Sequence, residues 1–149
     1  MEIERKFLVN SLPSHLERFA CKQIEQSYLC TDPVVRVRRT GDQYCLTCKG
    51  PGLLAREELN LPLTEESYLH LRSKADGAAI AKTRYFIPCA GHTIELDIFD
   101  PPFAPLVIAE VEFDSAEQAG AFRPPAWFGR EVTSDPTYTN AALSKKSAP

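Results

Sequence analysis

Charged and apolar residues alternate with a period of two in seven short segments of this 149-residue chain. The opening segment shows the pattern, because Glu2, Glu4 and Lys6 alternate there with Ile3, Arg5 and Phe7. Successive side chains of a β-strand point to opposite faces, so each such segment predicts a strand with one charged face. A single solvated edge strand would show the same alternation, so the other segments decide how the first is interpreted.

The charged faces of the predicted strands carry equal numbers of acidic and basic residues. The acidic residues are Glu2, Glu4, Glu58, Glu95, Asp97, Glu110 and Glu112. The basic residues are Lys6, Arg36, Arg38, Lys49, Arg56, Lys82 and Arg84. On several of these strands the opposite face is apolar, as at Ile94, Leu96 and Ile98. The apolar faces must be buried, and short helices packed outside the sheet would bury them.

Two arrangements of the charged faces fit this pattern. In an open antiparallel sheet these faces meet bulk water, and acids pair with bases on neighbouring strands at about 0.2–1 kcal/mol per pair. In a closed barrel the apolar faces point outward under the helices, the charged faces line the lumen, and no edge strand is left exposed. The alternation alone leaves both arrangements open.

A charged lumen would require ion pairs or ligands, because an isolated buried charge costs several kcal/mol even after relaxation. Clustered carboxylates without cysteine or histidine suit hard divalent cations such as Mg²⁺ or Mn²⁺. Clustered arginine and lysine suit phosphate oxygens. The closed barrel therefore predicts a site for a complex of a divalent metal with a polyphosphate.

Turn-forming residues divide the chain into about eight strands and two to four helices. We expect strands at residues 1–7, 21–30, 34–39, 43–49, 54–61, 80–87, 93–99 and 106–113. Helices are expected at 14–19, with Ser14 as its cap, 64–74, 115–122 and 138–146, and a loop at 124–129. Residues 40–42 and 89–92 predict hairpin turns. No repeat or long linker interrupts the sequence, which predicts a single, mainly β domain of the α+β class over residues 1–149.

The composition argues against several functional classes. A formal net charge of −3 is unlike that of a nucleic-acid-binding surface. The longest apolar runs are far shorter than the roughly 20 residues of a membrane helix, and the acidic N-terminus is not a secretory signal. Five cysteines, an odd number, predict free thiols in a reducing cytoplasm. Cys45 and Cys48 have C-x-x-C spacing, but no second pair follows to complete a zinc site.

The order of the charged motifs resembles that of the CYTH superfamily, also called the triphosphate tunnel metalloenzymes. The family signature E-x-E-x-K is present as Glu2-Ile3-Glu4-Arg5-Lys6. The later strand motifs match in order: Arg36-Val37-Arg38, Thr47-Cys48-Lys49, Arg56-Glu57-Glu58, Lys82-Thr83-Arg84-Tyr85, Glu95-Leu96-Asp97 and Glu110-Val111-Glu112. Residues 138–144 resemble the closing Y-x-N-x-x-L-A element of the family. The similarity spans nearly the whole chain.

The resemblance implies an eight-stranded antiparallel β-barrel that forms a tunnel for a linear triphosphate and one or two Mg²⁺ or Mn²⁺ ions. Among the seven acidic residues it implies Glu2, Glu4, Glu110 and Glu112 as the foremost metal ligands. Glu58, Glu95 and Asp97 would hold a second ion or position the attacking water. The seven basic residues would bind phosphate, and Lys6, Glu58 and Asp97 would take part in catalysis.

Three further residue types refine this expectation. Asn60 departs from the family pattern, since many members carry another glutamate there, and an amide would weaken a second metal site. Arg5 has the parity of the outward face and should be dispensable for the chemistry. No histidine is placed as an obvious base, because His15 and His70 fall on predicted helices and His92 in a turn.

The resemblance leaves the reaction open, because the family includes tripolyphosphatases, nucleoside and thiamine triphosphatases and class IV adenylyl cyclases. No motif for reading a nucleobase is apparent, and a plain tripolyphosphate needs only the charged lining. We therefore expect metal-dependent hydrolysis of inorganic tripolyphosphate to pyrophosphate and phosphate by a monomer or homodimer, with nucleoside triphosphates as poorer substrates. The alternatives are a cyclase that forms cyclic AMP from ATP, a thiamine or nucleoside triphosphatase, and a non-catalytic polyphosphate-binding module.

Overall fold

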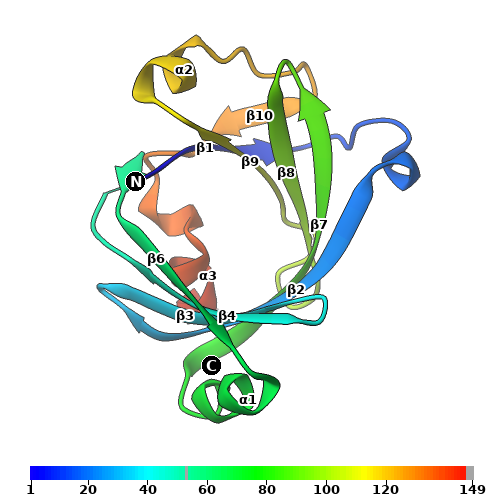
Figure 1. The fold of residues 1–149 in the computed structure, drawn as a ribbon. Helices are drawn as coiled ribbons and strands as arrows, with labels where there is room; N and C mark the ends of the chain where they lie inside the picture. Colours follow the sequence, from blue (N-terminus) through cyan, green and yellow to red (C-terminus); the bar gives the residue numbers. More distant parts are fainter. Residues whose placement is uncertain (53, 147–149) are drawn as a thin grey trace.

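The strands of the protein form one antiparallel sheet that curls into a nearly closed barrel (Figure 1). The computed structural model describes residues 1–52 and 54–146, so the last three residues of the expected domain lie outside the described part. Nine strands follow the order β10-β1-β9-β8-β7-β2-β3-β4-β6, and β5 pairs with β1. The strands are β1 (Glu2–Val9), β2 (Ala20–Thr31), β3 (Val34–Thr40), β4 (Gln43–Lys49), β5 (Ala55–Arg56), β6 (Glu58–Leu63), β7 (Asp76–Cys89), β8 (His92–Phe99), β9 (Val107–Phe113) and β10 (Phe128–Glu131).

The closed-barrel interpretation is confirmed, but two segments differ from the sequence-based expectation and raise the strand number above eight. The segment 54–61 was expected as one strand and forms two, β5 and β6, separated at Glu57. The break lets β5 pair with β1 while β6 pairs with β4, so this segment joins the two sides of the sheet and closes the barrel. The expected loop at 124–129 contributes Phe128 and Gly129 to β10, which pairs with β1.

Both predicted hairpin turns are present, and glycine makes them possible. The turn between β3 and β4 contains Gly41, whose φ is +61°. The turn between β7 and β8 places Ala90 and Gly91 at φ values of +50° and +80°. Two consecutive residues with positive φ are typical of the tight turns whose twist matches that of the flanking strands. These turns fix the register that brings the charged residues of neighbouring strands side by side.

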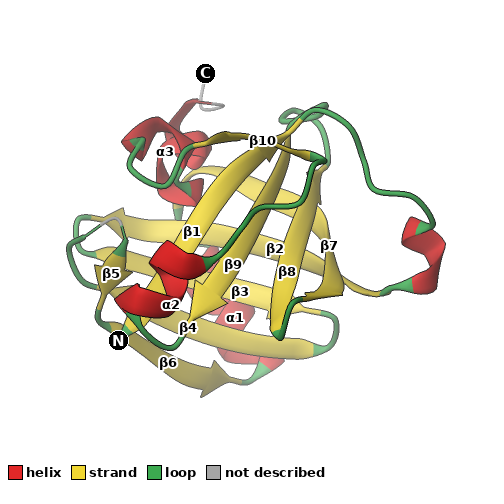
Figure 2. Ribbon diagram, turned by 90° about the horizontal axis from the view of Figure 1, so that it is seen from above, coloured by secondary structure: helices red, strands yellow, loops and turns green. Residues whose placement is uncertain are grey.

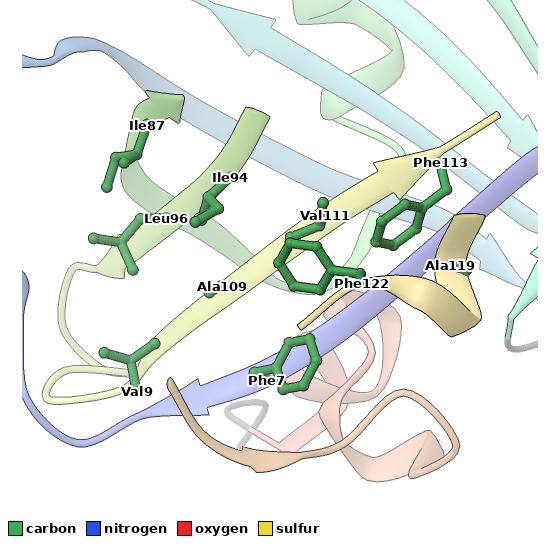
Figure 3. Close-up of a cluster of buried hydrophobic side chains, with 10 residues drawn as sticks. All are labelled: Phe7, Val9, Ile87, Ile94, Leu96, Ala109, Val111, Phe113, Ala119 and Phe122. Carbon is green, nitrogen blue, oxygen red and sulfur yellow. The ribbon is translucent and has the colours of Figure 1, made fainter. Parts of the chain in front are cut away.

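A hydrophobic cluster covers the outer face of β1, β7, β8 and β9 beneath α2 (Ala116–Ala121) (Figure 3). Its buried members are Phe7, Val9, Ile87, Ile94, Leu96, Ala109, Val111, Phe113, Ala119 and Phe122. The hydroxyl of Ser115 accepts a hydrogen bond from the backbone N–H of Gln118 and caps α2. The predicted helix at 14–19 is instead a 3₁₀ turn at Leu16–Arg18, preceded by His15 at a φ of 61° and without a side-chain cap.

The other two helices lie at different places on the barrel. Helix α1 (Glu65–Arg72) packs on the outer face of β2, β3 and β4, where Tyr68 stacks on Tyr44 and donates a hydrogen bond to Glu25. Helix α3 (Asn140–Lys146) lies across one end of the barrel rather than outside it, as Figures 1 and 2 show. Its Leu143 packs with Tyr28, Ile80, Phe99 and Ile108 and seals that end with an apolar plug. None of the described helices is long and apolar enough to cross a membrane.

Arg5 points outward from β1, and we expect its loss to affect stability alone. Its Nε and Nη2 donate to the two carboxylate oxygens of Glu131 at 2.9 and 2.7 Å, and its Nη1 donates to the carbonyls of Ala119 and Phe122 at 2.8 and 3.1 Å. Arg5→Met should lower the free energy of unfolding by about 1–3 kcal/mol, because several charge-assisted hydrogen bonds are lost. Urea unfolding measures this, with the exposed Arg123→Met as the matched control. If Arg5→Met changed the KM for tripolyphosphate by more than about twofold, the conclusion that Arg5 lies outside the site would be contradicted.

Candidate active site

The barrel encloses a cavity of about 250 Å³ whose described lining contains six acidic and six basic side chains. The acidic residues are Glu2, Glu4, Glu58, Glu95, Glu110 and Glu112, and the basic residues are Lys6, Arg36, Arg38, Lys49, Arg56 and Arg84. The alternation predicted that all twelve lie on the charged faces of the strands, and in the closed barrel these faces line the lumen. The remaining lining residues are Tyr28, Thr31, Val34 and, from the end closed by α3, Thr139, Asn140 and Ala141.

The first acidic wall is formed by β1 and β9, whose register sets Lys6 opposite Glu110 and Glu4 opposite Glu112. The ammonium of Lys6 lies 3.7 Å from Oε1 of Glu110 and donates to the carbonyl of Tyr138 at 3.2 Å. Burial alone would raise the pKa of Glu110, but the charges of Lys6 and Arg84 hold this pKa well below its usual range. Glu110 is therefore an ionised carboxylate with a cation already beside it.

Glu4 and Glu112 form a different pair, because neither has an ion-pair or hydrogen-bond partner within residues 1–52 and 54–146. Burial, together with the charges of Glu110 and Glu2, raises the pKa of Glu4 to about 7. Burial and the charges of Glu2 and Glu95 raise the pKa of Glu112 as well. Like charges directly opposite on neighbouring strands repel. Among the carboxylates of the described lining, these two lack a cation within ion-pair distance, so an added cation would relieve their repulsion from the neighbouring carboxylates.

A second group of charges lies where β5 and β6 close the barrel. The ammonium of Lys49 lies 2.8 and 3.1 Å from the two oxygens of Glu2 and 3.6 Å from Glu58. Nε of Arg56 lies 3.5 Å from Glu2, and the amide of Asn60 donates to Glu58 at 2.7 Å. Burial opposes the ionisation of Glu58, yet hydrogen bonds with Glu2 and Asn60 and the charge of Lys49 lower its pKa to about 2. Asn60 is thus one of several groups that favour the ionised form of Glu58.

The basic wall is formed by Arg36 and Arg38 of β3, which three strands separate from β9 in the sheet. Neither arginine has a carboxylate within ion-pair distance in the described chain, and the buried Nε of Arg36 has no hydrogen-bond partner there. Burial and the neighbouring charges of Arg36 and Arg84 lower the pKa of Arg38 to about 9. An anion in the cavity would therefore find its least compensated cations on this wall.

Lys82 and Asp97, also predicted as site residues, are fully buried beside the cavity and are not part of its described lining. Nε and Nη2 of Arg84 donate to the two oxygens of Asp97 at 2.7 and 2.8 Å, and the ammonium of Lys82 lies 2.6 Å from Oδ2. Nη1 of Arg84 also donates to Glu95 at 3.1 Å. Both oxygens of Asp97 are therefore occupied by cationic donors.

The lining fits a divalent cation that shares its ligands with a bound polyphosphate. Among the described side chains, no three of the acidic, cysteine or histidine residues already converge to hold an ion by themselves. Magnesium is commonly held by one or two carboxylates together with phosphate oxygens and water, rather than by an all-protein cage. Glu4 and Glu112 supply such a pair, and Glu2 and Glu110 lie beside them in the same lining.

Two groups of lining residues were missed from the sequence or left undecided there. Residues 139–141 enter the lining because α3 crosses the end of the barrel, and no local pattern reveals this position. Tyr28, which the sequence alone favours as a packing residue, both packs in the core and lines the cavity. Beside it, Gln26 is fully buried and accepts a hydrogen bond from Arg38. In the sequence, the position of Gln26 between Ile24 and Tyr28 on one face of the predicted strand was the signal that a neutral polar side chain is buried there.

The family model for the CYTH domain matches residues 1–132, and the chain belongs to this family. The chain is 40% identical to an inorganic triphosphatase of Nitrosomonas europaea, with 96% of each sequence covered. It is 35% identical to an inorganic triphosphatase of Acetivibrio thermocellus, with 97% of this chain and 93% of the relative covered. A crystal structure of the inorganic triphosphatase NE1496 matches the fold with a TM-score of 0.72 at 37% identity, covering 97% of this chain and 94% of the other.

Proposed function

We propose that this protein is a metal-dependent triphosphatase that hydrolyses inorganic tripolyphosphate to pyrophosphate and orthophosphate. The proposal rests on one observation. Side chains without an ion-pair partner in the described chain lie on separate walls of one cavity, with Arg36 and Arg38 on one wall and Glu4 and Glu112 on another. The full-length similarity to two proteins named inorganic triphosphatase supports the same reaction. Membership of the family implies dependence on a divalent metal, and the carboxylate lining suits Mg²⁺ or Mn²⁺.

In this proposal Arg36 and Arg38 bind phosphate oxygens first, because no carboxylate of the described residues lies within ion-pair distance of either guanidinium. Lys6, Lys49, Arg56 and Arg84 surround the remaining oxygens and stabilise the charge that spreads over them during phosphoryl transfer. Glu4 and Glu112 hold the metal, with Glu2 and Glu110 as the further ligands. When bound, the metal neutralises phosphate charge and lowers the pKa of a coordinated water. The lining is formally neutral, which suits a metal–polyphosphate complex better than a bare anion.

The shape of the cavity favours an inorganic substrate over one with an organic head group. A volume of about 250 Å³ is below the roughly 300–1,000 Å³ typical of pockets for drug-sized ligands. Helix α3 closes one end, and Tyr28 is the sole aromatic residue of the described lining. A nucleoside or thiamine group would have to remain outside, so these triphosphates are the poorer substrates. We expect the protein to be cytoplasmic, where both inorganic and organic triphosphates would be accessible to it.

A substrate panel tests the proposal directly. The purified protein is incubated with tripolyphosphate, ATP, GTP or thiamine triphosphate and either Mg²⁺ or Mn²⁺, and orthophosphate and cyclic AMP are measured. We expect orthophosphate release with tripolyphosphate to exceed that with each organic triphosphate by at least tenfold. Cyclic AMP from ATP would identify a cyclase instead. Binding of tripolyphosphate without turnover under either metal would identify a polyphosphate-binding module.

The raised pKa of Glu4 predicts a pH-dependent stability of the metal-free protein. The folded protein holds the Glu4 proton more tightly than the unfolded chain does, because burial and nearby carboxylates raise this pKa from 4.5 to about 7. This contribution to stability is complete below pH 4.5 and is lost as pH rises through 7. We expect the free energy of unfolding of the parent to fall by about 3 kcal/mol relative to Glu4→Gln over that interval. Urea unfolding at several pH values, with chelator present, measures the difference, and parallel curves for the two proteins would contradict it.

A further inference from the structure

The cations of β3 and β7 differ in the side chains that they contact. Arg84 and Lys82 of β7 are held by Asp97, whose carboxylate compensates much of their charge. Arg38 of β3 lies near enough to Arg84 to feel its charge, yet its side-chain partner is the neutral amide of Gln26. Arg84 is therefore hydrogen-bonded to a carboxylate, and Arg38 to a neutral amide.

The contact between Gln26 and Arg38 is built into the sheet. The two residues are direct partners across β2 and β3, and Nε of Arg38 donates to Oε1 of Gln26 at 2.8 Å. A guanidinium can only donate, so the amide oxygen must face Arg38. The amide nitrogen then turns to the hydroxyl of Tyr28 at 3.4 Å. Gln26 is 0% exposed, so bulk water cannot replace it as the acceptor.

This arrangement satisfies one nitrogen of Arg38 without neutralising the side chain. The terminal nitrogens Nη1 and Nη2 have no hydrogen-bond partner within the described chain, and Arg38 lines the cavity. Two terminal N–H groups in a fixed plane match two oxygens of a phosphate, which a tethered guanidinium binds at a smaller entropic cost than a free one. A carboxylate at position 26 would hold the guanidinium equally well but would cancel the charge that attracts the anion.

We propose that Gln26 is a positioning residue that fixes the guanidinium of Arg38 toward the cavity and leaves its full charge available to a phosphate group of the substrate. The inference rests on the proposed triphosphatase function, and it assigns a role to a buried residue outside the charged lining. In this inference the hydrogen bond of the amide orients the guanidinium, and the neutrality of the amide leaves the positive charge of Arg38 uncompensated.

The test compares Gln26→Glu, which keeps the shape and adds a charge, with Gln26→Met, which keeps the volume and removes the acceptor. Gln23→Glu is the matched control, because Gln23 lies on the same strand and is exposed, and its side-chain amide donates to the hydroxyl of Thr83. Calorimetric titration with tripolyphosphate in the absence of divalent metal should give a Kd about 10–100-fold higher for Gln26→Glu and about 5–10-fold higher for Gln26→Met. The control should bind like the parent. With metal present, KM should rise in the same order while kcat changes by less than about threefold.

Arg38→Met separates positioning from a general effect on packing. In that background Gln26→Glu should weaken tripolyphosphate binding by less than about twofold, because the group through which it acts is gone. The inference is overturned if folded Gln26→Glu or Gln26→Met binds tripolyphosphate like the parent, or if the effect persists in full without Arg38. A parent protein that does not bind tripolyphosphate would overturn the proposed function and this inference together, whereas normal parent turnover with an unaffected variant would overturn the inference alone.

Discussion

Glu112→Gln is expected to lower metal-dependent hydrolysis of tripolyphosphate by about 100-fold while leaving the protein folded. Glu112 faces Glu4 across β1 and β9, and no cation of the described chain lies within ion-pair distance of either carboxylate. The substitution removes one of the carboxylates proposed to bind the metal, and loss of a metal ligand costs at least the 10–100-fold known for groups that merely orient ligands. Stability should be unchanged or higher, because burial and the charges of Glu2 and Glu95 disfavour the ionised form of Glu112 in the absence of metal.

The measurement is orthophosphate release across a titration of Mg²⁺ or Mn²⁺, with thermal unfolding of the same samples. Glu117→Gln is the matched control, since Glu117 is an exposed glutamate of α2 on the outside of the barrel. A higher metal requirement for Glu112→Gln, with the control unaffected, is the expected pattern. An unchanged metal titration for Glu112→Gln would remove this residue from the proposed ligands.

The alternation with a period of two predicts which face each strand buries, whereas the closure of the sheet into a barrel was expected from the resemblance of the motif order to the CYTH superfamily. Once Glu4, Lys6, Glu95 and Glu110 share one face, the apolar residues between them must lie under helices outside. The break at Glu57 could not be predicted in this way, because the residues on both sides of it keep the parity of one continuous strand. The division into β5 and β6 follows from long-range pairing with β1 and β4, which leaves no local signal.

The candidate site was predictable to the same extent and for the same reason. Parity places Lys82 and Asp97 on the same face as Arg84 and Glu95, but it does not say how deep each residue lies along the barrel. The lining includes Arg84 and Glu95 and leaves out the fully buried Lys82 and Asp97. The charge pattern gives no signal for Gln26, because its side chain is neutral.

Asp97→Asn is expected to destabilise the protein by about 3–5 kcal/mol, the largest effect on stability that we predict. The substitution keeps the shape of the side chain but leaves the ammonium of Lys82, which is 0% exposed, without its carboxylate partner. Burial already lowers the pKa of Lys82 to about 8 despite the charge of Asp97. Removing one member of a buried ion pair typically costs this much, because the remaining charge cannot be solvated. Urea unfolding at pH 7 measures the loss.

Lys82→Met in the same chain should recover most of the stability lost in Asp97→Asn, because the stranded charge is removed and Arg84 keeps its hydrogen bond to Glu95. The double variant also tests the expected metal role of Asp97. If the carboxylate serves to hold Arg84 and Lys82, the restored protein should bind Mn²⁺ like the parent and hydrolyse tripolyphosphate with a raised KM. If Asp97 is a metal ligand, the double variant should fold but bind Mn²⁺ at least tenfold more weakly. The position of both carboxylate oxygens, each within 2.8 Å of a cationic nitrogen, favours the first outcome.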